Sequence, residues 1–152
     1  MIICDTHCDV LWMRQFEKKQ TPCVTMENMK KGGISLQTCT LFSGAGGPEK
    51  HPYEKAMAEY REFERLRDGE GWVQAFSPLE AEDGKVRVML SMEGGEILEG
   101  SVERLREFYA YGVRMIALTW NWENEIGHPA KLGGRGFGGF SRFTGASCRR
   151  IL

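Results

Sequence analysis

The chain has 152 residues, of which 20 are Lys or Arg and 21 are Asp or Glu, and its formal net charge is -1. This balance, with 41% hydrophobic residues, is typical of one folded globular domain and excludes a disordered chain. It gives no reason to expect nucleic acid or a membrane surface as a partner. Because a complete eight-stranded β/α barrel needs about 250 residues, a barrel-like chain of this length can hold only part of one.

Signals for export and for membrane insertion are missing from the sequence. No stretch approaches the roughly 18 apolar residues of a transmembrane helix, and the N-terminus lacks the regions of a secretory signal, so we expect a cytoplasmic protein. The five cysteines are an odd number without a Cys-x-x-Cys pair, which predicts neither a disulfide framework nor a zinc ribbon. We interpret them as reduced and mostly buried thiols.

Apolar runs and helical patterns alternate along the chain. The predicted strands are 2–5, 34–42, 71–76, 86–92 and 113–119. The predicted helices lie near 10–19, 26–31, 53–66, after Pro78, and from Val102 to Gly112, with Thr25, Ser77 and Ser101 as N-caps. About five strands alternating with helices predict an α/β fold built of right-handed βαβ units around a parallel sheet.

The pattern fails after residue 130. All 21 acidic residues lie at or before Glu125, whereas the segment 131–152 is rich in glycine and arginine and has no periodicity. We therefore predict one domain over residues 1–130 and an irregular or aberrant tail over 131–152.

Chemistry-bearing residues follow the first predicted strand. In parallel α/β proteins the ligand site gathers at the carboxyl ends of the strands. His7 and Asp9 are one residue apart, so in an extended segment both side chains project to one face, where they could bind one metal ion. Cys8 should point away from them. The alternative is that both side chains only cap and hydrogen-bond the turn.

Two further strand ends carry candidate residues. Glu93 ends an apolar strand, where a buried carboxylate is costly unless it is paired or binds metal; the alternative is that it accepts bonds from the next helix N-terminus. Trp120 and Asn121 follow the last predicted strand, and they either line a pocket or belong to the core. We interpret His51 as a solvated cap residue and His128 as a loop residue that could approach the site.

Four separated motifs lie along the chain: DTHCD at 5–9, KGGISLQ at 31–37, SMEGG at 91–95 and YGVRMIALTWN at 111–121. In this order, and over roughly residues 2–130, they resemble the N-terminal half of the membrane (renal) dipeptidase family, metallopeptidases of family M19. The resemblance implies part of a TIM-like (β/α)8 barrel with a two-zinc site that hydrolyses dipeptides, often with a D-residue at the C-terminal position.

The resemblance also implies roles for individual residues. His7 and Asp9 look like ligands of one zinc, and Glu93 looks like the carboxylate that bridges both zincs and serves the catalytic site. Trp120 stands where the animal enzymes have a histidine that helps to bind substrate, and Asn121 follows it. The family takes its other zinc ligands, a substrate-binding arginine and an acid/base aspartate from later strands, which residues 131–152 do not offer.

We therefore expect a truncated form with little activity alone, with a shifted reading frame after about Gly133. Two competing hypotheses stay open. One is another metal-dependent, amidohydrolase-like barrel hydrolase, although such enzymes usually begin with His-x-His. The other is a non-catalytic fragment whose exposed sheet edges drive self-association, and we expect a homo-oligomer.

Overall fold

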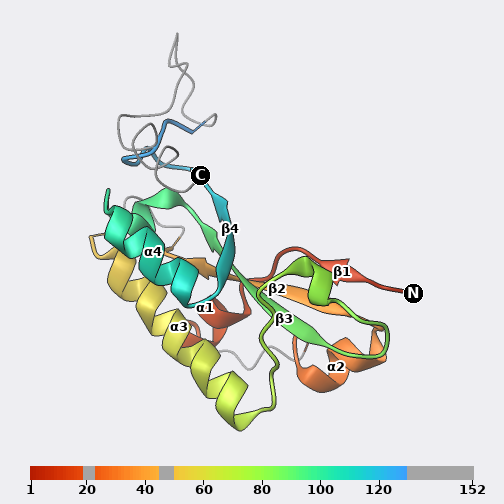
Figure 1. The fold of residues 1–152 in the computed structure, drawn as a ribbon. Coiled ribbons are helices and arrows are strands. Elements are labelled where there is room, and N and C mark those ends of the chain that lie inside the picture. The colour runs from red at the N-terminus through yellow and green to blue at the C-terminus, as the bar shows by residue number, and fades with distance from the viewer. Residues whose placement is uncertain (19–22, 45–49, 130–152) are drawn as a thin grey trace.

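A computed structural model describes residues 1–18, 23–44 and 50–129 of the chain (Figure 1). The strands are β1 (Cys4–Asp5), β2 (Leu36–Phe42), β3 (Arg87–Glu93) and β4 (Val113–Ala117). The α-helices are α1 (Val10–Gln15), α2 (Met26–Lys31), α3 (Pro52–Gly69) and α4 (Val102–Ala110), with short 3-10 helices η1 (Pro78–Glu80) and η2 (Gly95–Leu98). The tail predicted to be irregular lies outside the described residues.

The four strands form one parallel sheet in the order β1-β2-β3-β4. Neighbours in sequence are therefore neighbours in the sheet, as successive βαβ units require, and the predicted α/β class is confirmed. Figure 1 shows α1, α3 and α4 gathered on one side of the twisted sheet. None of the described helices is long and apolar enough to cross a membrane.

Three predicted helix caps are present. Oγ1 of Thr25 accepts a hydrogen bond from the backbone N–H of Asn28, and Oγ of Ser101 accepts one from that of Arg104. Oγ of Ser77 accepts one from the N–H of Leu79. These bonds satisfy orphan donors of the first helical turn and fix where each helix begins.

The segment 71–76, predicted as a strand, is not one. It makes a single parallel bridge, Gln74 to Val88, through the bonds Val88 N to Val73 O and Ala75 N to Val88 O, both 2.8 Å. The physical reason is competition for one edge of β3, because β4 pairs with that edge from Leu90 onward. The described part of the chain thus has four strands in place of about five.

The two faces of the sheet differ in chemistry because alternate strand residues point to opposite sides. On the helix-covered face, Cys39, Leu41, Val88, Leu90 and Met92 pack into the core with Ala56, Phe63 and Leu66 of α3. The other face carries the alternate residues Thr38 and Thr40 of β2 and Ser91 and Glu93 of β3. We call this second face the polar face because of these four residues, although Leu36 and Met89 pack together at its other end. The four polar residues lie towards the same end of the sheet as the segment that carries His7 and Asp9.

Candidate metal centre

Three predicted residues meet at the carboxyl end of the sheet. Ligand atoms of His7, Asp9 and Glu93 all lie within 4.8 Å of one another. Nε2 of His7 is 3.3 Å from Oδ1 of Asp9 and 3.8 Å from Oε2 of Glu93. The topology explains this meeting, since His7 follows β1 and Glu93 ends β3, two strands with parallel carboxyl ends.

The two carboxylates are poorly satisfied by the protein. Oδ1 of Asp9 is buried without a hydrogen-bond partner among the described residues, and Asp9, although the N-cap residue of α1, makes no side-chain capping bond. Burial raises the pKa of the Glu93 carboxyl, and the charges of Asp9 and Glu96 act in the same direction, against that of His7. A bound cation would relieve both conditions. One imidazole and two carboxylates are a donor set that suits zinc.

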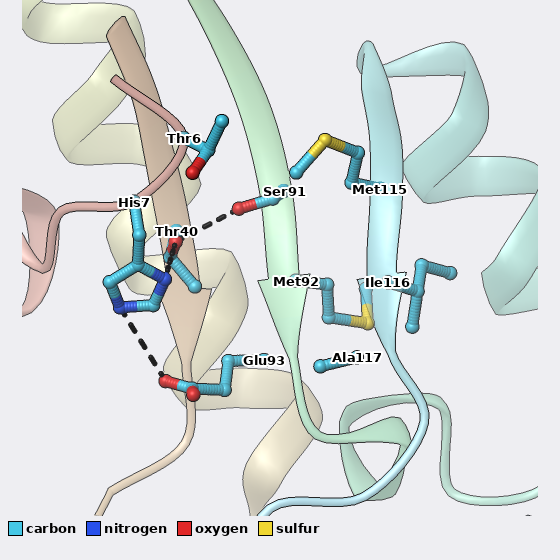
Figure 2. A pocket seen from close by; sticks show the side chains of 9 residues that line it. All are labelled: Thr6, His7, Thr40, Ser91, Met92, Glu93, Met115, Ile116 and Ala117. Atoms are coloured by element: carbon cyan, nitrogen blue, oxygen red, sulfur yellow. Dashed lines mark hydrogen bonds and ion pairs between the residues drawn. The ribbon is translucent and has the colours of Figure 1, made fainter.

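A hydroxyl chain orients the imidazole of His7. Nδ1 lies 3.2 Å from Oγ1 of Thr40, which in turn lies 2.9 Å from Oγ of Ser91 (Figure 2). When Nδ1 carries the proton, it donates to Thr40 and leaves the lone pair of Nε2 directed towards the two carboxylates. Neither Thr40 nor Ser91 was predicted from the sequence as a site residue. Their signal was a pair of polar residues within two buried, otherwise largely apolar strands.

A pocket of about 280 Å³ opens beside these groups. Figure 2 shows His7, Thr40, Ser91 and Glu93 along one side and the β4 residues Met115, Ile116 and Ala117 along the other. A polar wall facing an apolar wall suits a small ligand with one polar and one apolar part. His7 and Glu93 line this pocket, so a ligand bound in it would lie beside the candidate metal ligands.

The comparison with protein families decides the assignment. The model of the membrane dipeptidase family, peptidase family M19, matches residues 1–143. The chain belongs to the membrane dipeptidase family. No curated protein matches it.

Three solved structures share the fold of this chain at low sequence identity. A dipeptidase described as AC, a metallopeptidase of family M19, is 18% identical with a TM-score of 0.76 over 99% of this chain and 56% of its own. The metallopeptidase from Rhodobacter sphaeroides liganded with a phosphinate mimic of the dipeptide L-Ala-D-Ala is 17% identical with a TM-score of 0.76. Its match covers 99% of this chain and 56% of the relative. The probable dipeptidase PvdM from Pseudomonas aeruginosa is 18% identical with a TM-score of 0.77. Its match covers 99% of this chain and 44% of the relative. The chain thus spans about half the length of these structures, and the predicted partial TIM-like barrel is confirmed.

The remaining predicted residues are not part of the three-residue cluster. Trp120 packs edge-on against Phe42 at 5.0 Å between ring centroids, and Trp120 and Asn121 are half-buried outside the pocket lining. Their role in substrate binding stays a prediction. His51 is exposed beside Glu54, as expected, and His128 lies 3.6 Å from Glu123 and is not part of the three-residue cluster.

The two glycines after Glu93 bring two chain segments together. The N–H of Gly94 donates to the carbonyl of Ala117 and that of Gly95 to the carbonyl of Leu118, at 3.0 and 3.1 Å. In the structure, the surface that Gly95 approaches is the side chain of Ile126 and the backbone of Leu118.

Replacing Thr40 by valine should weaken zinc binding by this M19 chain roughly 10- to 100-fold. Valine keeps the shape of threonine but removes the oxygen that fixes the tautomer of His7. Isothermal titration with zinc measures the change. The matched control is Thr38→Val, which makes the same replacement two residues earlier on the same face of β2. Equal affinities for the two variants would contradict the role of Thr40.

One carboxylate is fully buried at the end of β2. Glu59 of α3 is fully buried, and its Oε2 accepts a hydrogen bond of 2.6 Å from the N–H of Phe42 at the end of β2. Burial raises its pKa well above 4.5, the charge of Asp9 raises it further, and the Phe42 bond and Lys55 oppose this. Glu59 was not predicted as a buried residue because it is charged, although its spacing, three residues after Ala56 and four before Phe63, places it on the buried stripe of α3.

Glu59→Gln should therefore raise stability at high pH. The raised pKa means that protonated Glu59 favours the folded state fully below about pH 4.5, and that this contribution is lost as the pH rises towards the folded-state value. Glutamine still accepts from Phe42 but cannot ionise, so the free energy of unfolding should exceed that of the wild type by about 1–3 kcal/mol at pH 8.

Urea denaturation at pH 5 and pH 8 measures this gain, which should shrink at the lower pH. The control is Glu62→Gln on the same helix. Hydrogen bonds from Arg65 and Arg14 lower the pKa of Glu62, although burial opposes them, so this change should cost stability at pH 8. A gain for Glu59→Gln that is equal at both pH values would exclude ionisation of Glu59 as its cause.

Proposed function

We propose that this chain is the N-terminal half of a zinc-dependent dipeptidase and supplies His7, Asp9 and Glu93 to a two-zinc site. The observation that carries the proposal is the convergence of these three side chains within 4.8 Å in a member of a metallopeptidase family. When bound, zinc supplies an activated water and polarises the peptide carbonyl. The proposed substrate is a dipeptide, including one with a C-terminal D-residue, and the phosphinate dipeptide mimic held by the Rhodobacter sphaeroides relative supports it.

The protein's own residues would prepare the site in two ways. Thr40, held by Ser91, presents Nε2 of His7 towards the metal position, so little reorganisation is needed on binding. Glu93 is partly desolvated, which strengthens its interaction with a cation relative to a carboxylate in water. The apolar β4 wall of the pocket would hold a substrate side chain beside these groups.

Metal analysis and a hydrolysis assay test the proposal together. The purified chain should bind zinc after dialysis, as measured by mass spectrometry of the metal. L-Ala-D-Ala and L-Ala-L-Ala should be cleaved in a zinc-dependent manner, slowly by residues 1–152 and rapidly by a protein that also carries the rest of the barrel. Cleavage that survives a chelator, or a chain that binds no zinc, would refute the proposal.

The competing hypothesis of a non-catalytic, self-associating fragment has its own support. Leu118 beyond β4 is 42% exposed, Met115 on β4 is 40% exposed, and Tyr109 on α4 is 62% exposed. Exposed apolar side chains beside a sheet edge promote association. Size-exclusion chromatography with zinc analysis separates the hypotheses. A monomer that holds zinc and cleaves a dipeptide excludes the fragment, whereas an oligomer without zinc favours it.

A further inference from the structure

Two thiols meet on the opposite side of β2 from the metal centre. Sγ of Cys8 lies 3.6 Å from Sγ of Cys39. Cys8 comes from the segment between the two predicted zinc ligands, and Cys39 is a fully buried residue in the middle of β2. Both pack with the helix-covered core, whereas His7 and Thr40 meet on the polar face.

The backbone already holds the two cysteine-bearing segments side by side. The N–H of Thr40, the residue after Cys39, donates a 3.0 Å hydrogen bond to the carbonyl of Cys8. Segments paired in this way lie within the range of backbone separations that disulfides span. The sulfurs need to approach by only about 1.5 Å to reach a bond length of about 2.05 Å, which rotation of the two side chains can supply.

We propose that Cys8 and Cys39 are an oxidisable dithiol that closes into an intramolecular disulfide and locks the ligand-bearing segment onto β2. The site takes a small-molecule disulfide, such as oxidised glutathione, as its oxidant. The four described cysteines are free thiols, as expected, although only Cys39 is buried. The inference concerns what Cys8 and Cys39 become on oxidation, and it does not depend on the proposed dipeptidase activity.

The exchange balances in two steps. Cys8, the more accessible of the pair, attacks one sulfur of oxidised glutathione, so that a mixed disulfide forms and one glutathione thiol leaves. The buried Cys39 then attacks the Cys8 sulfur and releases the second glutathione thiol. The two protein thiols lose two electrons and two protons, and these appear in two molecules of reduced glutathione.

The lock joins residues far apart in the chain. It ties the segment that carries His7 and Asp9 to the strand that carries Thr40, and it closes a loop over the intervening chain, including α1 and α2. Closing a loop of this length restricts the unfolded state. We expect the oxidised chain to unfold at a temperature higher by roughly 5–10 °C and to return to the original value on reduction.

The test compares reduced and oxidised protein under denaturing and native conditions. After equilibration with oxidised glutathione, mass spectrometry should show a chain lighter by two hydrogens, and peptide mapping should show Cys8 joined to Cys39. A variant with Cys4, Cys23 and Cys148 replaced by serine keeps only the proposed pair. It should form the same crosslink as the wild-type chain and show the same rise in Tm. Cys8→Ser and, independently, Cys39→Ala should abolish both the crosslink and the rise in Tm.

The outcomes are decisive in each direction. A folded three-serine variant that forms no crosslink at any ratio of oxidised to reduced glutathione would overturn the site. A Cys8–Cys39 crosslink that leaves Tm unchanged would overturn the lock. Because the crosslink is mapped directly in the wild-type chain, poor folding of Cys8→Ser or Cys39→Ala does not affect the result.

Discussion

Replacing His7 by alanine should abolish zinc binding by the chain. In the complete enzyme it should lower dipeptide hydrolysis by about 1,000-fold or more, a barrier increase of about 4 kcal/mol. His7 contributes the only imidazole of the three-residue cluster, and its Nε2 is the atom nearest to both carboxylates. Removing it leaves Asp9 and Glu93 as two like charges with no intervening donor, which also repel each other.

Glu93→Gln tests the same centre without a change of shape. An amide would bind a cation more weakly than a carboxylate does, so zinc affinity and hydrolysis should both fall, whereas the unfolding temperature should change little. The matched controls are His51→Ala and Glu54→Gln, since both residues are exposed at the start of α3 and contact each other at 3.4 Å. Wild-type zinc affinity in both His7→Ala and Glu93→Gln would refute the assignment of these residues as ligands. An equal loss of zinc affinity in the two control variants would show that the loss is not specific to the site.

The candidate ligands could be predicted from the sequence because their positions are local. His7, Asp9 and Glu93 stand at the ends of short apolar runs, and parallel topology alone brings such ends to one edge of the sheet. The orienting pair Thr40 and Ser91 could not be predicted in the same way. Their contact depends on the register of β2 with β3, in which Thr40 lies opposite Ser91, and a shift by one residue would separate them.

The errors have the same origin in tertiary structure. Residues 71–76 have the composition of a strand, but whether they form one depends on which segment pairs with β3, and β4 takes most of that edge. Glu59 is a charged residue at the spacing of the buried stripe of α3, and only the packing of α3 against the end of β2 brings it the N–H of Phe42 as a hydrogen-bond donor. Periodicity predicts that elements exist, whereas pairing and packing decide where their polar residues lie.

Gly95→Ala should destabilise the fold by about 2–4 kcal/mol, the largest loss that we expect from adding one methyl group. A Cβ at this position would meet Cδ1 of Ile126 and the carbonyl oxygen of Leu118 at 2.9 Å. Ile126 is itself buried, and the N–H of Gly95 donates to that same carbonyl, so neither neighbour can move freely. Urea denaturation measures the loss.

The control for this prediction is Gly69→Ala near the end of α3, where an added Cβ would meet nothing within 4 Å. Alanine favours a helix over glycine, so this variant should be unchanged or more stable by about 0.5–1 kcal/mol. Gly95 also lies two residues after Glu93, so pushing residues 118–126 away should displace that carboxylate and weaken zinc binding. If Gly95→Ala proves as stable as Gly69→Ala, the described close approach of Gly95 to Leu118 and Ile126 is wrong.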